Sequence, residues 1–169
     1  VGAPRTGTQS MFAALRKLGL NPIHSGYYAE LRDPLCAYLF GDKTHRSVDD
    51  VIATLNGFDA AMDEPYMLLY EEVLASLPDA KFLLTVSDPE SWFKNFQEIQ
   101  QLYETSGDPV FDNRQPYWDN CTGMASWGCT WTKDTKKECL QNYVRHTERV
   151  QQIIPPEKLL VYNWSDGWA

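Results

Sequence analysis

The residue types best suited to chemistry stand at the start of the chain, in a polar turn bounded by two glycines. Between Gly2 and Gly7 lie one cation, Arg5, and a threonine hydroxyl, and an apolar helical pattern begins at Met11. Such a turn lets backbone N–H groups converge, and a helix that starts there directs the positive end of its dipole at an anion. The stretch therefore predicts an anion-binding loop that suits a phosphate group. A glycine-rich turn without a ligand remains the alternative, because short glycine motifs often arise by chance.

The spacing of the two glycines matches the nucleoside triphosphate loop G-x-x-x-x-G-K-[ST], but two residues that carry its chemistry differ. Thr8 stands where that loop has its lysine, and Gln9 stands where it has the hydroxyl that binds magnesium. We therefore expect the loop to serve a reaction other than ATP hydrolysis. A kinase for a nucleotide or metabolite is disfavoured for the same reason.

The order Pro, Arg, Thr, Gly, Thr from Pro4 to Thr8 resembles the 5′-phosphosulfate loop of sulfotransferases. In that loop another hydroxyl usually follows, and Gln9 takes its place here. Sulfuryl transfer leaves negative charge on the departing phosphate, and a fixed cation beside helix N–H groups stabilises that charge without a metal. The resemblance implies 3′-phosphoadenosine 5′-phosphosulfate as co-substrate, with Arg5 taking part in catalysis. It also implies that the donor's 5′ end is held by Pro4, Arg5, Thr6, Gly7, Thr8, Gln9 and Ser10.

Four further blocks extend the resemblance, in the same order, over nearly the whole chain. They are the run from Leu77 to Trp92, the pair Tyr143 and His146, the run from Leu159 to Tyr162, and the run from Ser165 to Trp168. Together with the loop, these blocks are similar to the P-loop sulfotransferase-like family. That family implies a parallel sheet and binding of the phosphosulfate donor.

Two positions depart from the family's donor site. After the strand that ends at Val86 the family usually has Arg-Asp-Pro, and sulfotransferases use that Arg, with a Ser eight positions later, to hold the donor's 3′-phosphate. This chain has Ser87 and Asn95 there, with Lys94 nearby as a substitute point charge. An Arg–phosphate pair contributes roughly 1.5 to 3 kcal/mol, or about ten- to a hundredfold in affinity. It stays open whether Ser87 and Asn95 bind the donor or leave its site weakened.

Sulfuryl transfer also needs a base that takes the proton from the attacking hydroxyl or amine. Asp63 is our first candidate and Glu64 the second, because both follow a predicted short strand. The alternative is that either carboxylate caps the helix that starts at Pro65. His24 is a weaker candidate for the base, whereas His146 is expected to pack within a helix.

The elements that must position these residues alternate between strand and helix. We predict strands over 58–62, 81–86 and 158–162. We predict helices after the first loop, from a capping box at Ser47 to Asp50, from Pro65, from Asp88 as N-cap, and over 134–154. The remaining stretches are predicted as a connection over 20–24, an irregular segment over 25–46, and a long loop beside the site over 105–132.

Strands separated by helices imply right-handed crossovers and a parallel sheet. We expect an α/β fold, a three-layer α/β/α sandwich like that of P-loop nucleoside triphosphate hydrolases. Ligands bind such a sheet at the carboxyl ends of its strands. The loop at 2–10, the residues at 63–65 and the turn at 87–89 would then share one edge.

Length, net charge and the distribution of apolar residues limit the kinds of partner that we expect. The 169 residues are expected to form a single sulfotransferase-like domain, 1–169, that lacks the start of its first strand and a C-terminal helix. A net charge of −8 argues against a nucleic-acid partner, because phosphate backbones are held by clustered Lys and Arg. We expect a small-molecule acceptor and no membrane span, since no apolar run approaches roughly 20 residues. The oligomeric state stays open, as does the compartment, with a slight preference for the cytoplasm.

The cysteines predict neither a metal site nor a disulfide framework. Cys36, Cys121, Cys129 and Cys139 show no zinc-binding spacing, and no metal is expected. We prefer buried free thiols to a disulfide.

Three classes of function stay open at this level. The first is a sulfotransferase that acts on the hydroxyl or amine of a small acceptor. The second is a catalytically impaired binding protein that kept the fold and lost the 3′-phosphate site. The third, a P-loop kinase, is the least favoured and would show magnesium dependence.

Overall fold

The computed structural model describes residues 1–24, 29–41, 47–105, 129 and 135–167, and the side chains within these ranges except those of 29–33, 100 and 102–105. Its helices are α1 (Thr8–Lys17), α2 (Ala29–Phe40), α3 (Val48–Ala53), α4 (Tyr70–Ser76), α5 (Pro89–Thr105) and α9 (Lys136–Ile153). Its strands are β1 (Pro22–His24), β2 (Ala60–Met62), β3 (Phe82–Val86) and β4 (Leu159–Asn163). Two short 3₁₀ helices are η3 (Tyr66–Leu68) and η5 (Trp164–Asp166). The fold is a mixed α/β fold.

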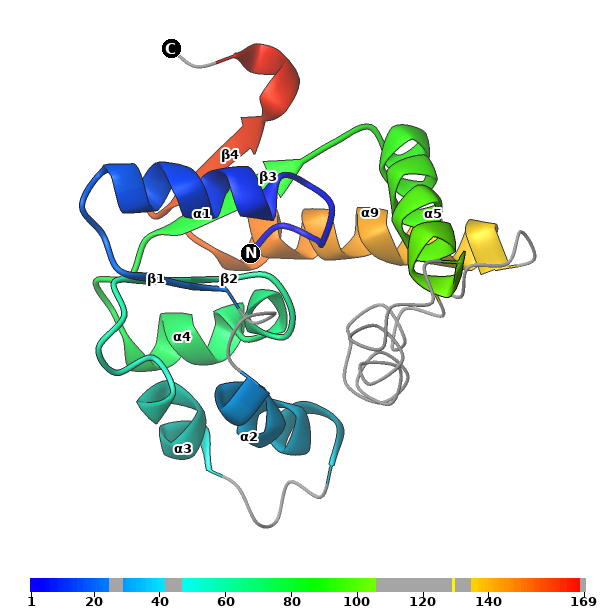
Figure 1. Cartoon of the computed structure of the whole chain (residues 1–169). Helices are drawn as coiled ribbons and strands as arrows, with labels where there is room; N and C mark the ends of the chain where they lie inside the picture. The colour runs from blue at the N-terminus through cyan, green and yellow to red at the C-terminus, as the bar shows by residue number, and fades with distance from the viewer. Residues whose placement is uncertain (25–28, 42–46, 106–128, 130–134, 168–169) are drawn as a thin grey trace.

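The described strands form two parallel pairs. β1 pairs with β2, so that Ile23 lies opposite Ala61, and β3 pairs with β4, so that Leu84 lies opposite Val161 (Figure 1). The expected strands at 58–62, 81–86 and 158–162 are thus confirmed in shorter or shifted form. The connection expected over 20–24 is wrong, since Pro22–His24 form a fully buried strand. A strand of three residues is too short to show periodicity in the sequence.

Three apolar clusters hold these elements together. One lies among β1, α2, α3 and the residues before α4, and centres on Ile23, Leu35 and Val51. A second lies between α5 and α9, where Trp92 and Tyr143 stack with ring centroids 4.2 Å apart. The third joins β3 to α4 and α9 through Tyr70, Phe82, Leu84, Val150 and Ile154. Figure 1 shows α1 on one side of β1 and β2 and α4 on the other.

The irregular segment expected over 25–46 is wrong for residues 29–40, which form α2. Pro34 lies inside this helix, and a proline usually interrupts a helix because it lacks an N–H group. Leu35, next to it, is completely buried against β1 and α3. Tertiary packing of this face therefore outweighs the local signal of the proline.

The helix-start signals of the sequence are confirmed where the structure describes them. Ser47 and Asp50 form the expected capping box at the start of α3, each side chain accepting the other's backbone N–H. The Asp88 carboxylate accepts the backbone N–H of Ser91 at 2.9 Å, as expected of an N-cap for α5. The cap at Asp88 fixes where the chain turns away from the end of β3.

The preference for free thiols is wrong. Cys129 and Cys139 form a disulfide that is buried in the cluster between α5 and α9, and Cys36 is disulfide-bonded as well. Spacing along the sequence does not decide which cysteines pair, because a disulfide requires their Cα atoms to come within about 7 Å of each other in the fold. Disulfides persist mainly in oxidising compartments.

A cavity of about 650 Å³ lies between the two strand pairs. Ala60 and Met62 of β2 line one side, and Phe82 and Thr85 of β3 line the other. Among the described residues, no helix is both long enough and apolar enough to cross a membrane.

Candidate active site

The loop before α1 has the backbone geometry of an anion site. Arg5 and Gly7 both lie in the left-handed region, with φ of 67° and 91°. Alternation of right- and left-handed residues turns successive N–H groups toward one concave surface that suits an anion. Gly7 is also the N-cap of α1, and no side chain within the described ranges caps that helix. The first N–H groups of the helix therefore point at the same concavity.

The loop is anchored to β3 through threonine hydroxyls. Thr6 is 1% exposed, and its Oγ1 lies 2.6 Å from Oγ1 of Thr85 and donates to the carbonyl of Ala3 at 2.5 Å. A Cβ on Gly2 would lie 1.9 Å from Oγ1 of Thr85, so only glycine fits beside this strand. Two tryptophans complete the anchorage, because the indole N–H groups of Trp92 and Trp164 donate to the carbonyls of Pro4 and Thr6.

Arg5 is the cation of the loop. Its side chain is exposed, and within the described part of the chain no carboxylate lies within ion-pair distance of it. A left-handed non-glycine residue costs roughly 1 to 2 kcal/mol, and such residues are found mostly where the surrounding structure enforces them. The guanidinium thus lies at the surface of the loop, without an ion-pair partner among the described residues.

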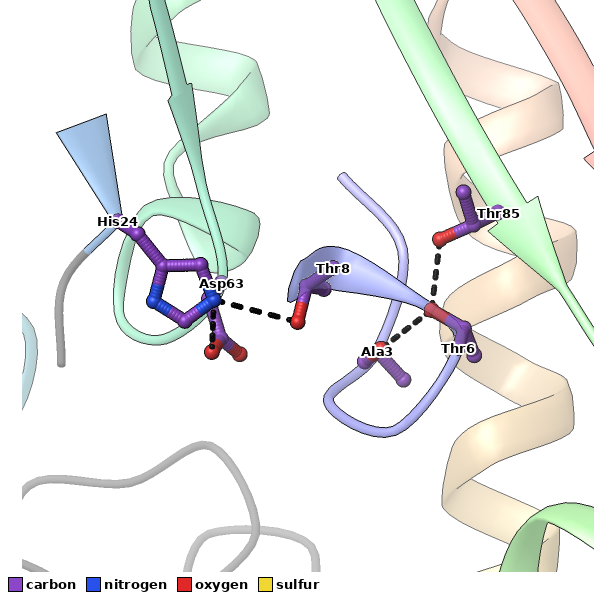
Figure 2. A network of polar contacts seen from close by, with 6 residues as sticks. All are labelled: Ala3, Thr6, Thr8, His24, Asp63 and Thr85. Atoms are coloured by element: carbon purple, nitrogen blue, oxygen red, sulfur yellow. Dashed lines mark hydrogen bonds and ion pairs between the residues drawn. The ribbon is translucent and has the colours of Figure 1, made fainter. Parts of the chain in front are cut away.

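A second group of side chains meets the start of α1 from the ends of β1 and β2. The imidazole Nε2 of His24 lies 2.9 Å from Oδ2 of Asp63 and 3.3 Å from Oγ1 of Thr8 (Figure 2). His24 is 3% exposed, whereas the Asp63 side chain is 19% exposed. Asp63 has a φ of 68°, so it shares the left-handed strain of Arg5. The structure thus brings the first base candidate, Asp63, and the weaker one, His24, together beside the loop.

Glu64 is placed differently from Asp63. It is 3% exposed, and neither Glu64 nor Asp63 caps the following 3₁₀ helix, which has no side-chain cap. The capping alternative is therefore wrong for η3. A carboxylate that receives a proton from a substrate must be accessible, so the partly exposed Asp63 suits this role better than the buried Glu64.

Two residues stand at the positions where the family has its 3′-phosphate contacts. Ser87 directly follows β3, and Asn95 lies in α5. The Tyr143 phenol lies 2.9 Å from the N–H of Ser87 and 3.0 Å from its carbonyl, so it fixes the backbone at this turn. Asn95 is exposed on α5, and Lys94 beside it lies 3.8 Å from Glu98. Ser87 and Asn95 take no part in the contacts that join Thr8, His24 and Asp63.

His146 has the packing role that the sequence favours. It is 8% exposed in α9, its Nε2–H donates to the carbonyl of Val1 at 2.9 Å, and its ring meets Tyr70 edge to face. Burial lowers the pKa of His146 below its ordinary value. A buried neutral imidazole with a fixed donor stabilises the fold and does not face the candidate site.

Sequence reasoning missed three contributors to this site. Thr85, Trp92 and Trp164 contact the loop from positions at least 79 residues away along the chain. Such contacts leave no local periodicity, although Trp92 and Trp164 lie in or beside two blocks that the family resemblance marked. The long loop expected beside the site over 105–132 falls outside the described residues, apart from 105 and 129. Among the residues described, no cluster of three or more His, Cys, Asp or Glu side chains could hold a metal ion.

Comparison with known proteins identifies the family. A model described as a sulfotransferase domain matches residues 1–169, and the chain therefore belongs to this sulfotransferase family. It is also similar to Ava biosynthesis cluster protein M of Aspergillus versicolor. The two sequences are 26% identical over 185 residues, which cover 99% of this chain and 71% of that protein.

Proposed function

We propose that this protein transfers a sulfuryl group from 3′-phosphoadenosine 5′-phosphosulfate to a hydroxyl or amine of a small acceptor. The observation that carries the proposal is the contact of the His24–Asp63 pair with Thr8 at the first turn of α1. It joins a proton-accepting pair to an anion-binding loop within a domain of the sulfotransferase family. The reaction needs both parts at one place.

The loop fits the 5′-phosphosulfate of the donor by its chemistry. Its left-handed residues and the start of α1 present N–H donors, and exposed Arg5 adds a cation. As the bond between the sulfur and the bridging oxygen breaks, negative charge develops on the 5′-phosphate. Donors fixed in advance stabilise that charge without reorganising, and such stabilisation commonly contributes more to the rate than any other single effect.

Asp63 accepts the proton of the acceptor in this proposal. The new bond forms between the acceptor's oxygen or nitrogen and the sulfur, the proton passes to the accessible carboxylate, and 3′-phosphoadenosine 5′-phosphate leaves. His24, held 2.9 Å from Oδ2 of Asp63, orients the carboxylate and donates to it through Nε2–H. Glu64 is the second candidate for the base and Ser87 and Asn95 are the candidates for the donor's 3′ end.

The direct test is transfer of ³⁵S-labelled sulfuryl groups from the donor to a panel of phenols, alcohols and amines. We expect labelled organic sulfate with and without a magnesium chelator. Absence of ³⁵S-labelled product, together with magnesium-dependent transfer of ³²P from γ-labelled ATP to the same acceptors, would favour a kinase-like site and contradict the proposal.

A second function is favoured by the residues at 87 and 95. Ser87 offers neutral groups where an arginine would supply two charged hydrogen bonds, and the exposed Asn95 adds no charge. A protein so altered would bind its ligands weakly and serve as a binding or interaction protein. Weak nucleotide binding without any labelled product would support this alternative.

We also propose that residues 1–169 form one domain whose two strand pairs belong to a single parallel sheet in a three-layer α/β/α sandwich. The cavity between β2 and β3 supports this, because both strands turn an edge toward it. The Val1 amine donates to the carbonyl of Leu83 at 3.0 Å, so the chain approaches β3 along that edge. Hydrogen exchange tests this, since the N–H groups of β2 and β3 should be equally protected if the two strands belong to one sheet.

A further inference from the structure

Two indole N–H groups bind carbonyl oxygens of the anion-binding loop. Trp92 donates to the carbonyl of Pro4 at 2.7 Å, and Trp164 donates to the carbonyl of Thr6. Trp92 is completely buried between α5 and α9. Trp164 is half-buried in η5, directly after β4, and reaches the loop from outside the apolar clusters.

These two contacts fix the direction of two N–H groups in the loop. The carbonyl and the N–H of a trans peptide point in opposite directions. Within the described ranges the cis bond lies at Glu64–Pro65, so the peptides after Pro4 and Thr6 are trans. Because the Thr6 carbonyl points at Trp164, the N–H of Gly7 points to the opposite side of the loop. The contact from Trp92 directs the N–H of Arg5 in the same manner.

Gly7 and Trp164 are also matched in shape. A Cβ on Gly7 would lie 2.1 Å from Nε1 and 2.3 Å from Cε2 of the Trp164 ring, so the indole lies against a residue without a side chain. Tyr162 also contacts the Trp164 ring, edge to face, with centroids 5.1 Å apart. Asn163 accepts the N–H of Ser165 at 3.1 Å, which closes the turn that carries the tryptophan.

We propose that Trp164 is a positioning residue of the donor site, which sets the Gly7 N–H toward the donor's 5′-phosphate. This inference rests on the proposed function, since it concerns the same anion. Without the indole N–H, the peptide between Thr6 and Gly7 is free to rotate, and the loop spends part of its time with a carbonyl toward the ligand. The donor then binds more weakly although the fold persists.

The test compares Trp164→Phe with the matched control Tyr162→Phe. The first variant keeps an aromatic ring but loses the donor to Thr6, whereas the second keeps its ring and loses a hydrogen bond to the carbonyl of Gly167. Each protein is titrated calorimetrically with 3′-phosphoadenosine 5′-phosphate. We expect affinity about three- to tenfold lower for Trp164→Phe, the span of one neutral hydrogen bond, and within about twofold of the unmodified protein for Tyr162→Phe.

An NMR readout separates positioning from a general structural effect. In ¹⁵N-labelled unmodified protein, the nucleotide should shift the Gly7 amide and the Trp164 indole signals, and in Trp164→Phe the Gly7 shift should be smaller at saturation. Unchanged affinity with an unchanged Gly7 shift in the variant would overturn the role of Trp164 alone. If Trp164→Phe does not fold, the test uses the unmodified protein alone. A Trp164 indole signal that does not shift when nucleotide is added would then overturn the role of Trp164. Absence of binding to the unmodified protein would overturn the proposed function and this inference with it.

Discussion

His24 and Asp63 meet at 2.9 Å although 39 positions separate them, because His24 ends one of two paired parallel strands and Asp63 directly follows the other. His24 ends β1, whose partner Met62 in β2 directly precedes Asp63. Parallel pairing therefore carries the two side chains to the same end of the sheet, where α1 begins with Thr8. The register of two short strands thus determines the geometry of the proposed base.

Replacement of Asp63 by Asn removes the proton acceptor while keeping a similar shape. We expect donor binding to persist and turnover to fall by roughly two to four orders of magnitude, the usual span for loss of a general base. Asp79→Asn, which alters an exposed carboxylate after α4, should leave turnover unchanged. The measurements are calorimetry and labelled sulfuryl transfer. Equal turnover in Asp63→Asn and in the unmodified protein would exclude this base.

Introduction of an arginine at position 87 tests the departure from the family's donor site. Ser87→Arg should raise the preference for nucleotides with a 3′-phosphate by about ten- to a hundredfold, from the roughly 1.5 to 3 kcal/mol of a charge-assisted contact. Affinities of 3′-phosphoadenosine 5′-phosphate and adenosine 5′-phosphate are compared for both proteins. A strong preference already present in the unmodified protein would mean that another cation holds the 3′-phosphate.

Parts of this fold follow directly from local sequence signals. The continuous apolar run at 82–86 forms β3, and Ser47 with Asp50 forms the expected capping box. α2 was missed because Pro34 suggests an interruption, and its packing on β1 is a long-range effect. The site was predictable in part, since the loop and Asp63 were expected at one edge. The pairing of His24 with Asp63 could not be predicted without the register of β1 and β2. The contact of Trp164 with Thr6 could not be predicted without the path of the chain after β4.

The buried histidine of α9 predicts a loss of stability in mild acid. Burial lowers the pKa of His146 from its ordinary 6.5, so the unfolded chain binds more protons than the folded protein below that pH. The contribution of His146 is therefore complete above about pH 6.5 and is lost as the pH falls toward its folded pKa. The free energy of unfolding, measured by urea between pH 7.5 and 5, should decrease less steeply in His146→Gln. An identical slope in both proteins would show that other groups cause the decrease.

The disulfide between Cys129 and Cys139 should stabilise the packing of α5 against α9. Its removal in Cys129→Ala/Cys139→Ala is expected to lower the free energy of unfolding by about 2 to 3 kcal/mol. Urea unfolding of both proteins without reductant gives the value. The protein is also unfolded without reductant and treated with a thiol reagent. Reaction of both Cys129 and Cys139 would show that the bond does not form.

The most direct test of the donor site is calorimetric titration of 3′-phosphoadenosine 5′-phosphate into the unmodified protein and Arg5→Ala. We expect binding of one nucleotide per chain without magnesium, and affinity about ten- to a hundredfold lower in the variant, from the loss of one charge-assisted contact. Thermal stability should change little because Arg5 is exposed, and Arg145→Ala, an exposed cation on α9, should bind normally. No binding, or equal affinity in a folded Arg5→Ala protein, would contradict the assignment of the loop as the donor site.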